Sequence, residues 1–128
     1  MLWGSNLQGQ LGDGTYTRRS TPTPVAGITN AVAVRAGGGV TCALHAGGTV
    51  ECWGNNVFGA LLDGTTTNRN TPALLPGIGD AAELALGGGQ ICVRHRSNQV
   101  TCWGYNAFDG LEDSTTIDRS SPVPVSDP

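Results

Sequence analysis

Residues 36–56 read AGGGVTCALHAGGTVECWGNN, and this stretch predicts two short strands joined by a tight turn. Residues 40–45 and 49–53 are mostly β-branched, apolar or aromatic, which is typical of strands. The three residues between them include Gly48, which supplies the left-handed conformation that a three-residue hairpin loop needs at its end. The stretch therefore predicts an antiparallel β-hairpin.

Four cysteines occupy facing positions in two such hairpins. If His45 and Thr49 close the first loop, alternate pairing puts Cys42 opposite Cys52 at a non-hydrogen-bonded pair, where a disulfide is geometrically feasible. The same count in residues 86–106, where Asn98 replaces the glycine, pairs Cys92 with Cys102. The wide spacing within each pair lacks the close ligand pairs of a zinc site. The pattern favours disulfides over the alternative of reduced, buried thiols, and disulfides predict an extracytoplasmic or secreted location.

The rest of the chain is a tandem repeat with an offset of fifty residues. The recurring positions are Trp3, Trp53 and Trp103; Asn6, Asn56 and Asn106; Asp13, Asp63 and Asp113; Arg19, Arg69 and Arg119; and Pro22, Pro72 and Pro122. Each unit offers about four short strands separated by turn residues, which is the pattern of a propeller blade. We therefore expect an all-β fold of tandem four-stranded antiparallel blades forming a partial β-propeller. The expected divisions are an incomplete blade at 1–30 and blade repeats at 31–80 and 81–128.

The repeat resembles a known family. The order W-G-x-N-x-x-G-x-L, D-G-T-T, T-P, A-G-G-x-x-T-C-A-L and G-T-V-x-C-W-G is similar to the regulator-of-chromosome-condensation (RCC1-like) repeat in its bacterial form. The resemblance implies a seven-bladed propeller, which at this period needs roughly 350 residues. We therefore expect the chain to be a fragment of a longer protein whose further blades complete the ring. Self-association of the chain into a closed ring is the alternative.

Composition excludes several function classes. The net charge of −3 and the absence of Lys/Arg runs give no footprint for nucleic acid or for an anionic membrane surface. No apolar run approaches the roughly 20 residues that a membrane span requires. Residues 2–4 directly after Met1 do not resemble a signal peptide.

Candidate catalytic, metal and cofactor residues have simpler interpretations. His45 and His95 recur with the repeat at hairpin ends, so a shared site is not expected. The recurring aspartates precede Gly or Ser and indicate turns, because the D-x-D-x-D-G spacing of a calcium loop is absent. The triple glycines lack the Gly-Lys-Ser/Thr of a phosphate-binding loop and indicate close packing. We assign no catalytic residue, no metal and no cofactor, and we expect no enzyme activity.

Positions that differ between matching copies are the candidates for recognition. They fall in one loop per repeat, and exposed loops on a rigid scaffold commonly carry binding function. The predicted partner-binding residues are Tyr16, Arg18, Asn68, Ile117 and Asp118. The expected function is a protein–protein interaction module that binds an unidentified protein partner. The alternatives are guanine-nucleotide exchange on a small GTPase, as in the family's eukaryotic namesake, and inhibition of a secreted enzyme, while a carbohydrate-active enzyme ranks last because paired acids are missing.

Overall fold

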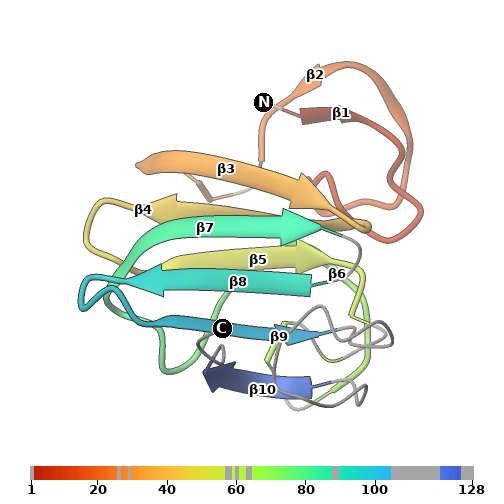
Figure 1. Cartoon of the computed structure of the whole chain (residues 1–128). Helices are drawn as coiled ribbons and strands as arrows, with labels where there is room; N and C mark the ends of the chain where they lie inside the picture. Colours follow the sequence, from red (N-terminus) through yellow and green to blue (C-terminus); the bar gives the residue numbers. More distant parts are fainter. Residues whose placement is uncertain are drawn as a thin grey trace.

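The computed structural model of the chain contains three antiparallel sheets (Figure 1). It describes residues 2–25, 27–28, 30–56, 59, 61–62, 65–87 and 90–104, and the backbone of 119–124. Across this part of the chain the strands are β1 (Leu2–Gly4), β2 (Arg19–Thr23), β3 (Ala31–Gly37), β4 (Val40–His45), β5 (Val50–Gly54), β6 (Arg69–Leu74), β7 (Ala81–Gly87), β8 (Gln90–His95), β9 (Val100–Gly104) and β10 (Arg119–Pro124). β1 pairs with β2, and two four-stranded sheets follow in the orders β3-β4-β5-β6 and β7-β8-β9-β10. The predicted all-β class with four-stranded antiparallel sheets is confirmed.

The two inner hairpins adopt the expected register. Cys42 faces Cys52 in β4–β5, and Cys92 faces Cys102 in β8–β9. In each pair the two sulfurs lie at bonding distance, 2.06 Å and 2.16 Å, and the two Cα atoms are 4.1 Å apart. The Cα spacing fits the close, non-hydrogen-bonded position of an antiparallel ladder.

The turns of these hairpins need residues that tolerate a positive φ. Gly48 has a φ of 99° and Asn98 has a φ of 71°. Gly48 is further restricted because a Cβ there would lie 2.6 Å from the carbonyl oxygen of Gly79. The close approach brings the β4–β5 turn onto the segment that leads into β7, where the Ala81 amide donates to the Gly48 carbonyl oxygen. The turn therefore also joins the two four-stranded sheets.

The first strands of the two larger sheets, β3 and β7, also come close together (Figure 1). A Cβ at Gly37 would lie 3.2 Å from backbone atoms of Gly87, so the glycine lets the two strands approach. Residues 88 and 89 of the second glycine triplet lie outside the described residues. Tight packing is thus the role of Gly37, as its place in a glycine run predicts.

The main core lies between the two four-stranded sheets. Its members come from the inner strands of both sheets and from the connection between them. They are Val40, Cys42, Leu44, Val50, Cys52, Leu61, Leu75, Ile78, Ala81, Leu84, Ile91, Val93 and Trp103. Neither four-stranded sheet buries these side chains alone, as expected for a repeat architecture.

The three repeated tryptophans differ in burial, although the sequence predicts the same packing role for all of them. Trp53 and Trp103 are fully buried, whereas Trp3 is 60% exposed. The Trp53 indole donates to the Gln10 carbonyl oxygen at 2.9 Å, so the loop of the preceding repeat covers it. Trp3 has only Met1 before it in this sequence and no such loop within the described residues. The packing expected for Trp3 is therefore wrong in this chain.

The described residues contain no helix, and so none long and apolar enough to cross a bilayer.

Candidate protein-binding loop surface

The recognition residues predicted from the sequence lie in the loops that connect β1 to β2 and β5 to β6. The first loop packs directly against the start of β6, where the Gly14 amide donates to the Asn70 carbonyl oxygen at 2.8 Å. A Cβ at Gly9 would lie 2.5 Å from the Arg69 carbonyl oxygen, so only glycine permits this approach. The two loops therefore lie next to each other at one end of the sheets (Figure 1).

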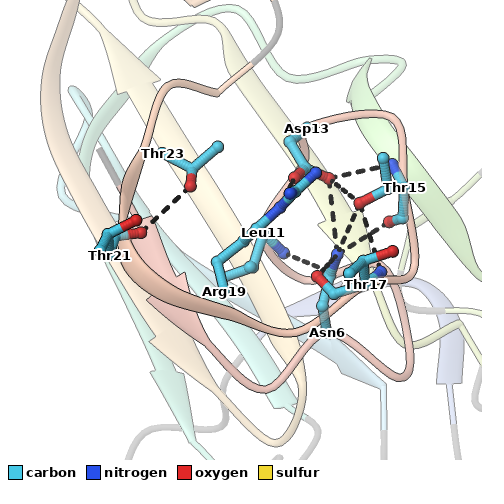
Figure 2. Close-up of polar contacts among 8 residues, drawn as sticks. All are labelled: Asn6, Leu11, Asp13, Thr15, Thr17, Arg19, Thr21 and Thr23. Carbon is cyan, nitrogen blue, oxygen red and sulfur yellow. Dashed lines mark hydrogen bonds and ion pairs between the residues drawn. The ribbon is translucent and has the colours of Figure 1, made fainter.

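A buried asparagine organises the first loop (Figure 2). The Asn6 side chain is fully buried, and its amide donates to the carbonyl oxygens of Thr15 and Thr17 at 2.9 and 3.0 Å. Its oxygen accepts the Leu11 amide at 2.9 Å. One side chain thus replaces backbone pairing that the loop cannot make by itself, because buried polar groups are costly unless they are hydrogen-bonded.

Asp13 holds the same loop from the other side (Figure 2). Its carboxylate accepts the Thr15 hydroxyl at 2.6 Å, the Thr15 amide at 2.9 Å and the Arg19 Nε at 2.9 Å. The Thr15 hydroxyl bond, aided by the Arg19 charge and opposed by burial, lowers the pKa of Asp13 from 3.8 to about 2. Asp13 therefore has the turn role that the sequence predicts. Arg19 pairs within its own loop, so the expectation that it bridges neighbouring loops is wrong.

The second repeat contains the same asparagine network. Asn56 is fully buried, and its amide donates to the carbonyl oxygens of Thr65 and Thr67 at 3.0 and 3.1 Å. Its oxygen accepts the Leu61 amide at 2.9 Å. Positions that are identical between the two copies therefore fix the backbone of both loops, and the third copy lies outside the described residues.

The variable residues sit on top of this fixed backbone. Tyr16 is half exposed, and Thr17 and Arg18 are exposed. Asn68 is half-buried, and its oxygen accepts the Asn56 amide at 2.9 Å, so it also supports its own loop. We use the term loop surface for residues 16–18 and 66–68. The remaining predicted binding residues, Ile117 and Asp118, lie outside the described residues.

The two histidines have separate local partners. His45 Nε2 lies 2.9 Å from the Glu51 carboxylate. His95 lies between Asp80, at 2.6 Å from Nδ1, and the Thr101 hydroxyl, at 2.9 Å from Nε2. The His95 bond lowers the pKa of Asp80. Both histidines tie a hairpin end to its own sheet or entry strand, and they do not form a shared site.

The Asp80–His95–Thr101 alignment has the order of a proton relay, but nucleophilic catalysis also needs a substrate position and oxyanion donors. The two cavities found in the described residues do not include Thr101. The same residues contain no group of three or more His, Cys, Asp or Glu placed to hold a metal ion.

Sequence reasoning did not assign the asparagine network. Asn6 and Asn56 were visible only as recurring letters, and turns commonly contain asparagine for conformational reasons. The available signal was their joint recurrence with Thr15 and Thr65 and with the arginine that starts the next strand. Such joint recurrence indicates a bonded set more strongly than it indicates independent turn residues.

The sequence of residues 2–44 matches the Regulator of chromosome condensation (RCC1) repeat. The chain is made of RCC1-type repeats. The comparison with curated proteins gave no match.

Solved structures share the arrangement over nearly the whole chain. Human WBSCR16 superposes with a TM-score of 0.77 at 29% identity, over 97% of this chain and 32% of that chain. Yeast RCC1 (Prp20) bound to Kap60 gives a TM-score of 0.78 at 19% identity, over 98% of this chain and 31% of that chain. Prp20p from Saccharomyces cerevisiae, described with its binding to Gsp1p and histones, gives 0.75 at 17% identity, over 98% and 33%. The four-stranded sheets are therefore RCC1-type propeller blades, and the chain spans about a third of the length of these relatives.

Proposed function

We propose that this chain is a non-catalytic protein-interaction module that binds a protein partner through the loop surface. The observation that carries the proposal is the division of labour within the loops. Buried Asn6 and Asn56 fix the backbone with identical contacts, while the residues above them differ between copies and face solvent. A rigid support with variable exposed tips suits recognition, because little conformational entropy is lost on binding.

The fold comparisons support the same class of function. Yeast RCC1 (Prp20) was solved in complex with Kap60, and Prp20p is described with its binding to Gsp1p and histones. These partners belong to those proteins, and at 17–19% identity the likeness transfers only the fold. A protein partner for this chain is in line with them.

The compartment that we propose is extracytoplasmic. It is supported by two cysteine pairs at disulfide distance, since such bonds persist in oxidising compartments. Nucleotide exchange on a small GTPase is the second candidate, and it would operate in the reducing cytosol. Accelerated release of labelled GDP from a small GTPase would favour that candidate over the first.

The experiment that tests the loop surface compares partner capture by matched variants. Tyr16→Ala/Arg18→Ala removes the exposed tip of the first loop without touching the network beneath it. Arg35→Ala is the control, because Arg35 is an exposed arginine on β3, outside the loop surface. We expect the double variant to lose partners identified by mass spectrometry with the wild-type chain, and the control to retain them. Equal capture by all three proteins would refute the proposal.

A further inference from the structure

An apolar cavity of about 270 Å³ separates the β1–β2 sheet from the β3–β6 sheet. Its wall includes the first strand, the segment after β2, and the facing sides of β3 and β5. The lining residues are Leu2, Pro24, Val25, Ile28, Val34 and Trp53. We use the term groove for this cavity and its lining.

The repeat supplies a counterpart to the groove in which the space is filled. Fifty residues further on, Val34 becomes Leu84, which lies between the two four-stranded sheets. Leu84 is 6% exposed, whereas Val34 is 43% exposed. Val25 and Ile28, both half-buried, correspond to Leu75 and Ile78, which are 1% and 6% exposed. The same positions are therefore closed at one interface and open at the other.

The filled interface shows which side chains close it. The residues of the β3–β6 sheet that share a cluster with Leu75 and Leu84 come mainly from β4 and the start of β5, and they are Val40, Cys42, Leu44, Val50 and Cys52. By the fifty-residue offset, Cys52 corresponds to Leu2, and the counterparts of β3 and β4 fall before the first residue of this sequence. The groove thus lacks the contribution of one inner hairpin.

The backbone at the groove is open in the same place. β5 pairs with β4 on one side and β6 on the other, and β9 is likewise flanked by β8 and β10. β1, their counterpart, pairs only with β2 among the described residues. An unpaired strand edge beside an apolar cavity offers both parts of a strand-addition site, namely backbone hydrogen bonds and side-chain pockets.

We propose that the open edge of β1 and the groove bind a two-stranded hairpin of the β3–β4 type, supplied by another RCC1-type repeat. The hairpin adds its second strand antiparallel to β1, as β4 adds to β5. It inserts the apolar side chains of alternate positions into the groove, as Val40, Cys42 and Leu44 do at the filled interface. This site is separate from the loop surface and does not depend on the function proposed for it.

The test uses the full chain and a synthetic peptide with the sequence of residues 31–45, carrying Cys42→Ala to prevent thiol exchange. Isothermal titration calorimetry is expected to show saturable binding with one peptide per chain. Because an isolated hairpin is marginally stable in water, the peptide folds on binding and its affinity is modest. Hydrogen exchange is expected to slow at the β1 amides in the complex.

Matched variants separate groove binding from general adhesion. Val34→Asp puts a charge into the groove and is expected to weaken binding by about tenfold or more, because an unpaired charge is costly to bury. Leu74→Asp makes the same kind of change at an exposed β6 position outside the groove and is expected to bind as the wild type does. A peptide with Leu44→Asp is expected not to bind, which tests the site without altering the chain.

Three results would overturn the proposal. The first is the absence of saturable binding at about 1 mM peptide, the weak end of specific affinity. The second is equal binding of the Leu44→Asp peptide. The third is sedimentation evidence that the chain dimerises and that Val34→Asp abolishes the dimer, because a second copy would then occupy the edge.

Discussion

The two interfaces between consecutive sheets use equivalent residues, yet Leu84 is 6% exposed at one and Val34 is 43% exposed at the other. Nothing in the sequence near Val34 distinguishes it from Leu84 as a core residue, since both are apolar residues near the middle of a strand that starts a sheet. The difference comes from the neighbouring repeat, which presents four strands in one case and two in the other. Burial in this fold is thus a property of pairs of repeats.

The largest expected effect separates the tryptophans. Trp53→Ala removes a fully buried indole and its bond to Gln10, and we expect the free energy of unfolding to fall by about 3–5 kcal/mol. Trp3→Ala alters a side chain that is 60% exposed, and we expect a change within about 0.5 kcal/mol. Urea unfolding followed by far-UV circular dichroism measures both. Equal losses would show that Trp3 is packed in solution.

The second effect compares the apolar residues of the two interfaces. Leu84→Ala is expected to lower the free energy of unfolding by about 2–5 kcal/mol, because it opens a cavity in a filled core. Val34→Ala is expected to cost less than about 1 kcal/mol, since its side chain already borders an open groove. The same urea titration checks the pair, and a cost at Val34 that matched the cost at Leu84 would contradict the comparison.

The third effect concerns the two cysteine pairs. Replacing either pair by alanine is expected to lower the free energy of unfolding by roughly 2–3 kcal/mol, the value for a loop this short. Their reactivity is expected to differ, because Cys42 and Cys52 are fully buried whereas Cys92 is half-buried and borders a cavity beside Arg94.

Partial reduction by a thiol followed by alkylation and mass spectrometry measures that difference. We expect Cys92 and Cys102 to be labelled first. Labelling of Cys42 and Cys52 at the same rate would mean that reduction requires global unfolding of the chain.

The smallest effect is a pH dependence of the loop that covers Trp53. The pKa of Asp13 in the folded chain is about 2, below its ordinary 3.8, so its contribution to stability is present above about pH 4 and is lost as pH falls toward 2. We expect the difference in unfolding free energy between wild type and Asp13→Asn to shrink over this range. A difference that stayed constant from pH 6 to pH 2 would show that the Asp13 carboxylate charge is not responsible.

The hairpins could be predicted from the sequence because their determinants are local. Alternating apolar residues, a three-residue turn and its last residue decide the register, and Gly48 and Asn98 both take the expected positive φ. Leu62 shows the limit of such reasoning. It replaces Gly12 in the second copy and still adopts a positive φ of 57°, so the surrounding repeat imposes the conformation on an unfavourable residue.

The loop surface was predictable only in part. Variation between copies located Tyr16 and Arg18 as exposed residues, but it also selected Asn68, whose oxygen is used inside the loop. Side chains that bond to backbone many residues away, as Asn6 does to Thr17, leave no periodic signal in a single repeat. The open groove could not be predicted at all, because it depends on which strands of the neighbouring repeat are present.

Both disulfides close within one hairpin, over a sequence separation of 10 residues, and neither joins two sheets. Under a pulling force on the ends of the chain, the sheets can therefore separate from one another while each hairpin stays closed. Each bond withholds about 30 Å of extended backbone from the stretched chain, given the span of a fully extended residue. Reduction would then appear in a single-molecule extension trace as two added increments of length.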